Sequence, residues 1–154
     1  MNSKNRGGIP AQFVAMTPIP VSGAPSLVNL IRNKVKAGFP SPAEDLGVVR
    51  LDLTKLIGAD EEDAYFMWVS GDSMIQFGIF DGDLVLIRKR KRPRHGQIVI
   101  ACLDRDFLVK KLYKKPDGTR LQAGNPDVPD IVLKEGQTLE VWGVVTNTVR
   151  MFKA

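Results

Sequence analysis

The sequence is poor in the two residues that most often carry metal or thiol chemistry. Its 154 residues include one histidine, His95, and one cysteine, Cys102. A single cysteine cannot form an internal disulfide, and no cysteine, histidine and carboxylate cluster has the spacing of metal ligands. We therefore expect no metal and no cofactor, and we expect Cys102 to be a buried strand thiol in a reducing cytoplasm. Any nucleophilic serine must use His95 or a neutral lysine as its base.

Long apolar runs are also absent. No stretch approaches the roughly 20 apolar residues of a membrane-spanning helix, and residues Met1 to Gly8 lack the apolar core of a secretory signal. Hydrophobic residues make up 44% of the chain and charged residues 25%, which is ordinary for one globular domain. These features predict a cytoplasmic protein that does not associate with a membrane.

Acidic residues are missing from the first 37 positions, which carry five basic residues. Residues 1–25 are rich in proline and glycine and have no sustained period, which predicts a flexible arm. Residues 38–154 carry 17 basic and 17 acidic side chains, so their net charge is zero. Six of those basic residues form one run: Arg88, Lys89, Arg90, Lys91, Arg92 and Arg94. The rest of that segment is therefore acidic, and we expect the basic arm to dock on it.

From about residue 47 the sequence alternates between short apolar runs and turn signals. Strands are predicted over 48–51, 64–69, 84–87, 97–103, 107–113, 120–123, 131–133 and 139–149. Many short strands with few helices indicate a single, mainly β domain with an antiparallel barrel or sandwich. A short amphipathic helix is expected over 26–36, with Ser26 as its N-cap, and one or two helical turns over 52–57.

One segment could supply a nucleophile and another a base. Ser73 follows a predicted strand in the sequence Ser70-Gly71-Asp72-Ser73-Met74, where Gly71 would let backbone amides approach a substrate carbonyl. Lys110 shares a predicted strand face with two leucines, which would suppress its charged form. Lys111 lies on the opposite face, so alternation does not choose between the two lysines, and both could equally be solvated side chains.

Taken together, these segments resemble the UmuD-like members of the LexA/UmuD family of self-cleaving Ser-Lys proteins. The likeness covers residues 37 to about 149. It rests on these segments: Ala37-Gly38-Phe39-Pro40-Ser41-Pro42-Ala43, Ser70-Gly71-Asp72-Ser73-Met74-Ile75 with Asp81-Gly82-Asp83-Leu84, His95-Gly96-Gln97-Ile98-Val99-Ile100-Ala101, Phe107-Leu108-Val109-Lys110-Lys111-Leu112 and Val141-Trp142-Gly143-Val144-Val145.

The resemblance implies a role for each matching position. Ser73 would be the nucleophile, Lys110 the general base, and the backbone N–H groups of Asp72 and Ser73 the oxyanion donors. Cleavage between Ala37 and Gly38 would remove the arm, residues 1–37, from a β domain, residues 38–154. The resemblance also implies a homodimer, stimulation by RecA filaments on single-stranded DNA, and service of the trimmed form to a Y-family translesion polymerase.

Other features depart from that family and leave alternatives open. The first 36 residues do not match UmuD-like proteins and lack a helix-turn-helix, which argues against a complete LexA-type repressor. The run from Arg88 to Arg94 is foreign to the family, and it is either a solvated hairpin tip or a contact for DNA or a polymerase. The rival functions are a non-catalytic accessory protein, a repressor that lacks its DNA-binding domain, and a signal peptidase. His95 is expected in a structural turn among arginines.

Overall fold

The computed structural model describes residues 19–20, 25–31 and 47–153. The fold is mainly β and antiparallel, as the sequence predicted, and each strand predicted after residue 47 is present to within two residues. The elements in chain order are β1 (Ile19–Pro20), β2 (Leu27–Ile31), β3 (Val48–Asp52), α1 (Leu53–Ile57), β4 (Ala64–Trp68), the 3-10 helix η2 (Ile75–Phe77), β5 (Leu84–Arg88), β6 (Ile98–Leu103), β7 (Asp106–Lys115), β8 (Gly118–Gln122), β9 (Ile131–Val132) and β10 (Leu139–Val149).

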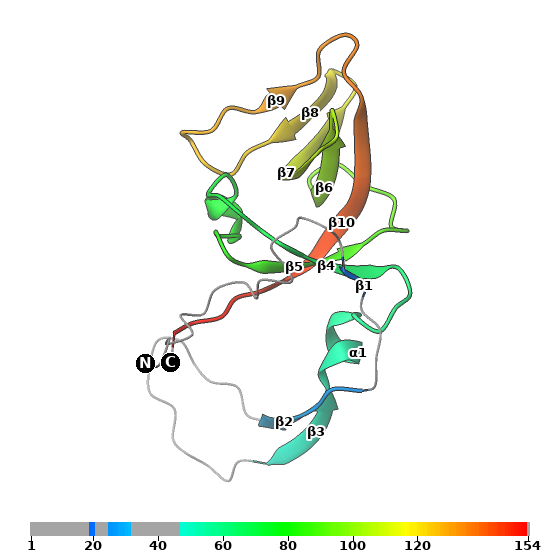
Figure 1. Ribbon diagram of the computed structural model, residues 1–154, viewed down its shortest axis with the longest axis vertical. Helices are drawn as coiled ribbons and strands as arrows, with labels where there is room; N and C mark the ends of the chain where they lie inside the picture. The colour runs from blue at the N-terminus through cyan, green and yellow to red at the C-terminus, as the bar shows by residue number, and fades with distance from the viewer. Residues whose placement is uncertain (1–18, 21–24, 32–46, 154) are drawn as a thin grey trace, which may run out of the picture.

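Strand β10 joins the two halves of the main sheet. The sheet has the order β1-β4-β5-β10-β6-β7-β8-β9, and β10 runs from the β6 side to the β5 side (Figure 1). Its first part pairs with β6 and its last part with β5, with irregular register between Val141 and Gly143. A Cβ at Gly143 would lie 2.6 Å from Ile87 Cγ2, so glycine is required where the strands approach each other at this crossing.

The central strands are buried on both faces, which explains their continuous apolar sequences. On β6, Ile100 belongs to a core with Met67, Met74 and Ile87, whereas its neighbour Val99 belongs to a second core with Leu112 and Leu121. This arrangement brings β7 and the loop after β4 close to the same core.

The edge of the main sheet next to β4 is covered by β1. Ile19 pairs with Phe66 and Pro20 with Tyr65 in antiparallel register. Proline has no backbone N–H, so Pro20 cannot donate a hydrogen bond to a further strand. The segment that precedes the proposed cleavage site therefore contributes the outermost strand on this side of the sheet.

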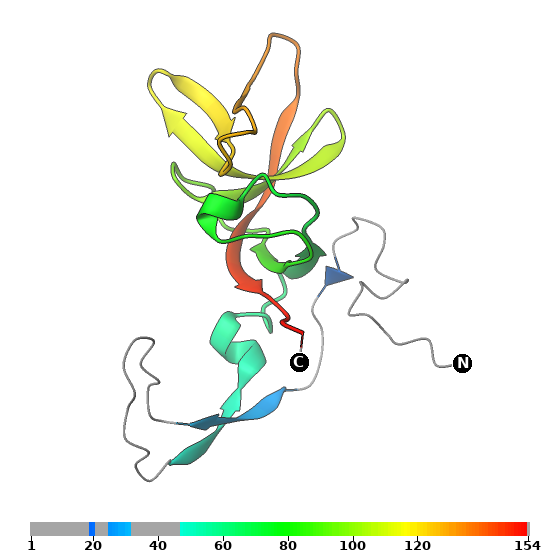
Figure 2. The same ribbon diagram turned by 90° about the vertical axis from the view of Figure 1, so that its left-hand side faces the viewer.

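Strands β2 and β3 form a separate two-stranded ribbon that projects with α1 from the lower end of the main sheet (Figures 1 and 2). The helix expected over 26–36 is wrong for residues 27–31, which form β2. The turns expected over 52–57 are confirmed as α1, where Asp52 caps the first turn and Gly58 ends the helix with φ of +72°. The short coil of η2, green in both views, lies apart from this ribbon (Figure 2).

Candidate active site

Ser73 lies in the loop after β4, which we call the serine loop (residues 69–78). Gly71 has a φ of +91° and a Cβ there would meet nothing within 4 Å, so glycine is needed for its conformation and not for space. The Gly71 N–H donates to Asp81 Oδ1 at 2.7 Å. On the other side of the serine, Met74 is buried in the core. Ser73 is therefore held between two fixed points.

The base of the serine loop is clamped by an ion pair with the residue that follows β10. Arg150 Nε lies 2.8 Å from Asp83 Oδ1, and its terminal Nη2 lies 2.7 Å from Asp83 Oδ2 and 2.7 Å from the Gly78 carbonyl. The Asp83 carbonyl also accepts a hydrogen bond from Val69 N–H at 2.8 Å. Asp83 is 1% exposed. The hydrogen bond from Arg150 holds the pKa of this carboxyl below its ordinary value, although burial opposes that effect.

Lys110 reaches the serine from β7. It pairs with Val99 of β6, is 6% exposed, and places its Nζ 2.6 Å from Ser73 Oγ. The neighbouring Lys111 instead places its Nζ 4.7 Å from the centre of the Phe77 ring. The fold thus resolves the choice that strand alternation left open, because only Lys110 contacts the serine hydroxyl.

Burial sets the protonation of the Lys110 amine. Removing the ammonium from water lowers the pKa of Lys110 below its ordinary value. In the described part of the chain, Ser73 Oγ is its one hydrogen-bond partner, and no carboxylate forms an ion pair with it. A neutral amine at this distance can accept the hydroxyl proton as the oxygen attacks a carbonyl.

The backbone on either side of the serine nucleophile candidate is tied to the loop after β8. Gly124 N–H donates to the Ser73 carbonyl at 2.6 Å, and Asn125 Nδ2 donates to the Asp72 carbonyl at 3.2 Å. Asn125 is buried, with 7% of its surface exposed. Asn125 lies between the strands predicted over 120–123 and 131–133, and no local pattern in the sequence marks a contact with a residue 53 positions away.

A cavity of about 160 Å³ opens beside Ser73 and Lys110. Its walls are mostly apolar and come from β4, β6, β7 and the serine loop: Met67, Trp68, Val69, Ser70, Ser73, Ile100, Phe107, Leu108, Val109 and Lys110. An extended segment with small apolar side chains suits such a site. The Ala37–Gly38 bond itself lies outside the described residues.

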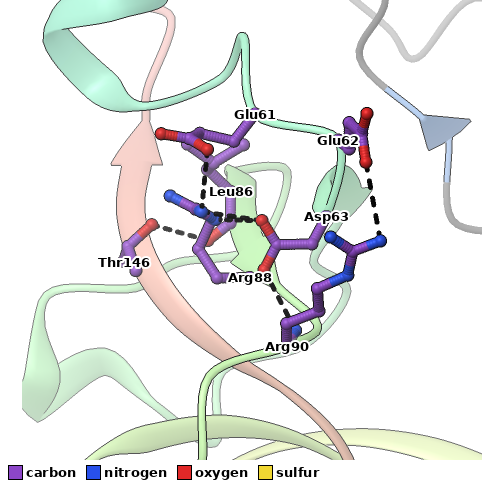
Figure 3. Close-up of polar contacts among 7 residues, drawn as sticks. All are labelled: Glu61, Glu62, Asp63, Leu86, Arg88, Arg90 and Thr146. Atoms are coloured by element: carbon purple, nitrogen blue, oxygen red, sulfur yellow. Dashed lines mark hydrogen bonds and ion pairs between the residues drawn. The ribbon is translucent and has the colours of Figure 1, made fainter.

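The basic run from Arg88 to Arg94, expected to be either a solvated hairpin tip or a contact for DNA or a polymerase, does not present all of its charges to solvent. Arg88 places Nε 2.8 Å and Nη2 2.7 Å from Asp63 Oδ1, and Glu61 lies 3.6 Å away (Figure 3). The expectation for Arg88 is therefore corrected, because its charge is used in an internal ion pair of low exposure. Burial alone would raise the pKa of Asp63, but the hydrogen bonds from Arg88 and from the Arg90 N–H lower it overall.

The other members of the run are exposed. Arg90 lies 3.5 Å from Glu62, and the Lys89 Nζ lies 4.9 Å from the centre of the Trp142 ring (Figure 3 shows the Arg90 pair). Lys91, Arg92 and Arg94 have no side-chain ion pair with other described residues. The exposed positive charge is therefore concentrated in the loop between β5 and β6.

The lone histidine and cysteine lie away from the serine. His95 is exposed in the turn before β6, where its Nδ1 accepts a hydrogen bond from Lys114 N–H at 3.2 Å. Cys102 is free on β6 as predicted, but it is half-buried and not fully buried. Among the described residues no group of three histidine, cysteine or acidic side chains could hold a metal, and no helix is long and apolar enough to cross a membrane.

A β domain with a serine hydroxyl on a buried lysine defines a class of serine peptidases, and the chain belongs to the Peptidase S24-like family. That family's model matches residues 29–146. The match begins before residue 37, so the likeness extends further toward the amino terminus than the motifs alone indicated.

Named relatives locate the chain within that family. Protein ImpA of Escherichia coli is 35% identical over 133 residues, which cover 86% of this chain and 90% of ImpA. Protein MucA of Escherichia coli is 35% identical over 117 residues, 75% of this chain and 80% of MucA. The LexA repressor of Syntrophotalea carbinolica is 35% identical over 120 residues, 78% of this chain but only 58% of the repressor. The chain is a member of the LexA/UmuD family of self-cleaving SOS-response proteins.

The ImpA match also corrects one expectation about the first 36 residues. An alignment of 133 residues cannot fit within positions 38–154, so part of the segment before the proposed cleavage site is aligned as well. At least part of the segment before residue 37 therefore does match a UmuD-like protein, contrary to the expectation from the sequence.

Proposed function

We propose that the protein cleaves its own Ala37–Gly38 bond with Ser73 as nucleophile and Lys110 as general base. The observation that carries this proposal is the 2.6 Å contact between a buried lysine amine and the serine hydroxyl. Ser73 Oγ attacks the Ala37 carbonyl carbon while neutral Lys110 takes the hydroxyl proton. The N–H groups of Asp72 and Ser73 stabilise the oxyanion that forms.

The remaining steps return the site to its starting state. The tetrahedral intermediate collapses, the Ala37–Gly38 bond breaks, and protonated Lys110 gives its proton to the departing Gly38 amine. Water then attacks the ester between Ala37 and Ser73 while Lys110 accepts its proton. The ester bond breaks, the Ala37 carboxylate leaves, and Lys110 returns the proton to Ser73 Oγ. The products are the arm, residues 1–37, and a β domain of residues 38–154.

The cellular role that best fits the family is control of translesion DNA synthesis. RecA assembled on single-stranded DNA would favour the conformation in which the bond enters the active site, which is a shift of population and not a supply of catalytic groups. The trimmed homodimer would then act as an accessory subunit of a Y-family polymerase. The similarity to ImpA and MucA, which extends over most of their length, supports this role over that of a transcriptional repressor.

Self-cleavage is tested on the purified full chain. Mass spectrometry after incubation at about pH 10, or at neutral pH with RecA, ATP and single-stranded DNA, should detect the two fragments. The rate should rise with pH and level off once Lys110 is neutral, below the ordinary lysine value of 10.5, because burial lowers the Lys110 pKa. Ser73→Ala and Lys110→Ala should each slow the cut by at least about a thousandfold, whereas Lys111→Ala should cut normally. A chain that stays whole under both conditions would refute the proposal.

We further propose that the exposed basic residues between β5 and β6 contact single-stranded DNA. Three exposed cations form no ion pair with another described residue, and each can neutralise a phosphate and release its counterion: Lys91, Arg92 and Arg94. Replacing the three by serine should reduce the slope of log affinity against log salt by about 2. Serine at three exposed lysines elsewhere, Lys55, Lys134 and Lys153, is the control that removes the same charge. Equal slopes for the two variants would argue against a contact at this loop.

A further inference from the structure

The loop after β8 holds the peptide groups that flank the serine. The Gly124 N–H donates to the Ser73 carbonyl and the Asn125 side chain donates to the Asp72 carbonyl. In return, Gln76 N–H donates to the Gly124 carbonyl at 2.8 Å. Three hydrogen bonds thus join two segments that are distant in the sequence.

Close packing fixes the distance between the two segments. A Cβ at Gly124 would lie 2.5 Å and 2.8 Å from ring carbons of Phe77, which is in η2 directly after the serine. Only glycine allows the loop after β8 to approach the serine loop this closely. The hydrogen bonds to the Asp72 and Ser73 carbonyls therefore come from a fixed platform.

The orientation of the Asn125 amide is set by its second contact. Its Oδ1 accepts a hydrogen bond from the Asp127 N–H at 3.0 Å, and an N–H donor can be satisfied only by the oxygen of the amide. The NH₂ group must then face the Asp72 carbonyl, which is an acceptor. The amide oxygen and the NH₂ group of Asn125 each have a hydrogen-bond partner, and flipping the amide would break both bonds.

Fixing one carbonyl oxygen also fixes the N–H of the same peptide group. The peptide between Asp72 and Ser73 is planar, so its C=O and N–H point in opposite directions. When Asn125 holds the Asp72 oxygen on the side of the β8–β9 loop, the Ser73 N–H points away from that loop. The Ser73 N–H is one of the two oxyanion donors proposed above.

We infer that Asn125 is a positioning residue for self-cleavage, which fixes the direction of the Ser73 N–H by anchoring the other end of the same peptide group. This inference rests on the proposed function. Among the described residues Asn125 forms no hydrogen bond with Lys110 or with the Ser73 hydroxyl, so it acts through the backbone. Without the Asn125 bond the Asp72 oxygen would keep only the 3.4 Å contact from the Ile75 N–H. The Ser73 N–H could then turn more freely and would have to be reoriented in the transition state, which lowers the rate.

Asn125→Asp is the sharpest test, because it preserves size and the acceptor for Asp127 N–H. It replaces the NH₂ donor with a carboxylate oxygen that repels the Asp72 carbonyl. The cleavage rate at the alkaline plateau should fall about 10- to 100-fold, less than the loss of an oxyanion donor itself. The pH midpoint is tested with Asn125→Ala, which adds no charge near Lys110: the pH at which its rate reaches half the plateau should not move, since that value belongs to Lys110.

Two further variants keep the result interpretable. Asn147→Asp makes the same chemical change at a half-buried position of β10 and should cleave at the wild-type rate. Asn125→Ala removes the donor without adding repulsion, and a similar loss is expected if the aspartate variant does not fold. Thermal unfolding of every variant shows which ones are folded at the assay temperature.

The outcomes separate this inference from the function on which it rests. If the wild type cuts and both Asn125 variants cut equally fast, the positioning role is refuted and the Ser-Lys proposal stands. A slower cut by Asn125→Ala with a shifted pH midpoint would also refute it, because Asn125 would then act through the lysine. A wild-type chain that never cuts would refute both proposals.

Discussion

At the scale of single residues, the site depends on one amine that the fold keeps out of water. Lys110 is 6% exposed and contacts the serine hydroxyl, whereas Lys111, one position later, contacts an aromatic ring. Strand alternation could not distinguish the two lysines, because both faces of β7 carry apolar neighbours. The likeness to the LexA/UmuD family selected Lys110 in advance. Asn125 was missed because nothing local in the sequence marks a side chain that meets a carbonyl in a distant loop.

The burial of Lys110 predicts a stability that depends on pH in a definite direction. Because its pKa is lower in the folded state than in the unfolded chain, the folded state binds this proton less tightly. The destabilisation is fully present at pH values below the lowered pKa, and it disappears as the pH rises to the ordinary value of 10.5. Lys110→Met should therefore raise the free energy of unfolding at neutral pH, and the gain should shrink toward pH 10.5.

Urea unfolding at several pH values would measure this gain. Both proteins should carry Ser73→Ala, so that no cleavage occurs at alkaline pH. A gain of the same size at every pH would contradict the prediction, because it would arise from better packing of methionine and not from the ammonium.

At the scale of secondary structure elements, turn signals and apolar runs predicted every strand after residue 47, because glycine, proline and aspartate mark where strands end. The prediction failed at β2. Leu27, Leu30 and Ile31 of this strand fall near helical spacing, which is why a helix was expected. Antiparallel pairing with β3 decides the conformation of such a short segment instead. The family model begins at Asn29, within that ribbon.

The ion pair of Arg150 and Asp83 should be the main support for the serine loop at the end of β10. Arg150→Ala leaves a buried carboxylate without its partner, and we expect a loss of about 3 kcal/mol in the free energy of unfolding. This is the lower end of the range for buried pairs, because a third of the arginine side chain stays exposed. Arg92→Ala, at an exposed position, should change stability by less than about 0.5 kcal/mol.

The same pair predicts an acid dependence. The lowered pKa of Asp83 means that its contribution is present at neutral pH and is lost as the pH falls below 3.8 through the lowered value. The difference between Arg150→Ala and the wild type should therefore shrink over the acidic interval that begins at about pH 3.8 and extends downward. Chemical unfolding across that interval measures it, and a difference that stays constant would show that lost packing of the arginine dominates.

At the scale of the whole molecule, the charge map of the sequence required the structure for its interpretation. The order of residues in the sequence shows six cations in one run, but Arg88 forms an internal ion pair with Asp63 (Figure 3). The partner of Arg88 lies 25 residues earlier, in the turn before β4, and no pattern in the sequence links the two. The sequence could therefore predict a basic loop but not which of its basic side chains face solvent.

The arm and the β domain are connected through β1, which makes the effect of cleavage measurable in the backbone. In a chain that begins at Gly38, the β4 edge at Tyr65 and Phe66 has lost its neighbour. Amide hydrogens of β4 should exchange faster in this chain than in full-length Ser73→Ala protein, whereas those of the central strand β6 should not change. Equal exchange of β4 in the two proteins would show that β1 gives no protection.

Loss of β1 from this edge gives the proposed cleavage a second consequence, which concerns aggregation. An edge strand with proline lacks one backbone N–H for further pairing. An edge strand with unpaired N–H and C=O groups can hydrogen-bond to an extended segment of another chain. Cleavage would therefore not only remove the arm but also leave β4 as an unpaired edge strand of the product. The cleaved protein should aggregate less when its polymerase partner binds soon after cleavage than when no partner is present.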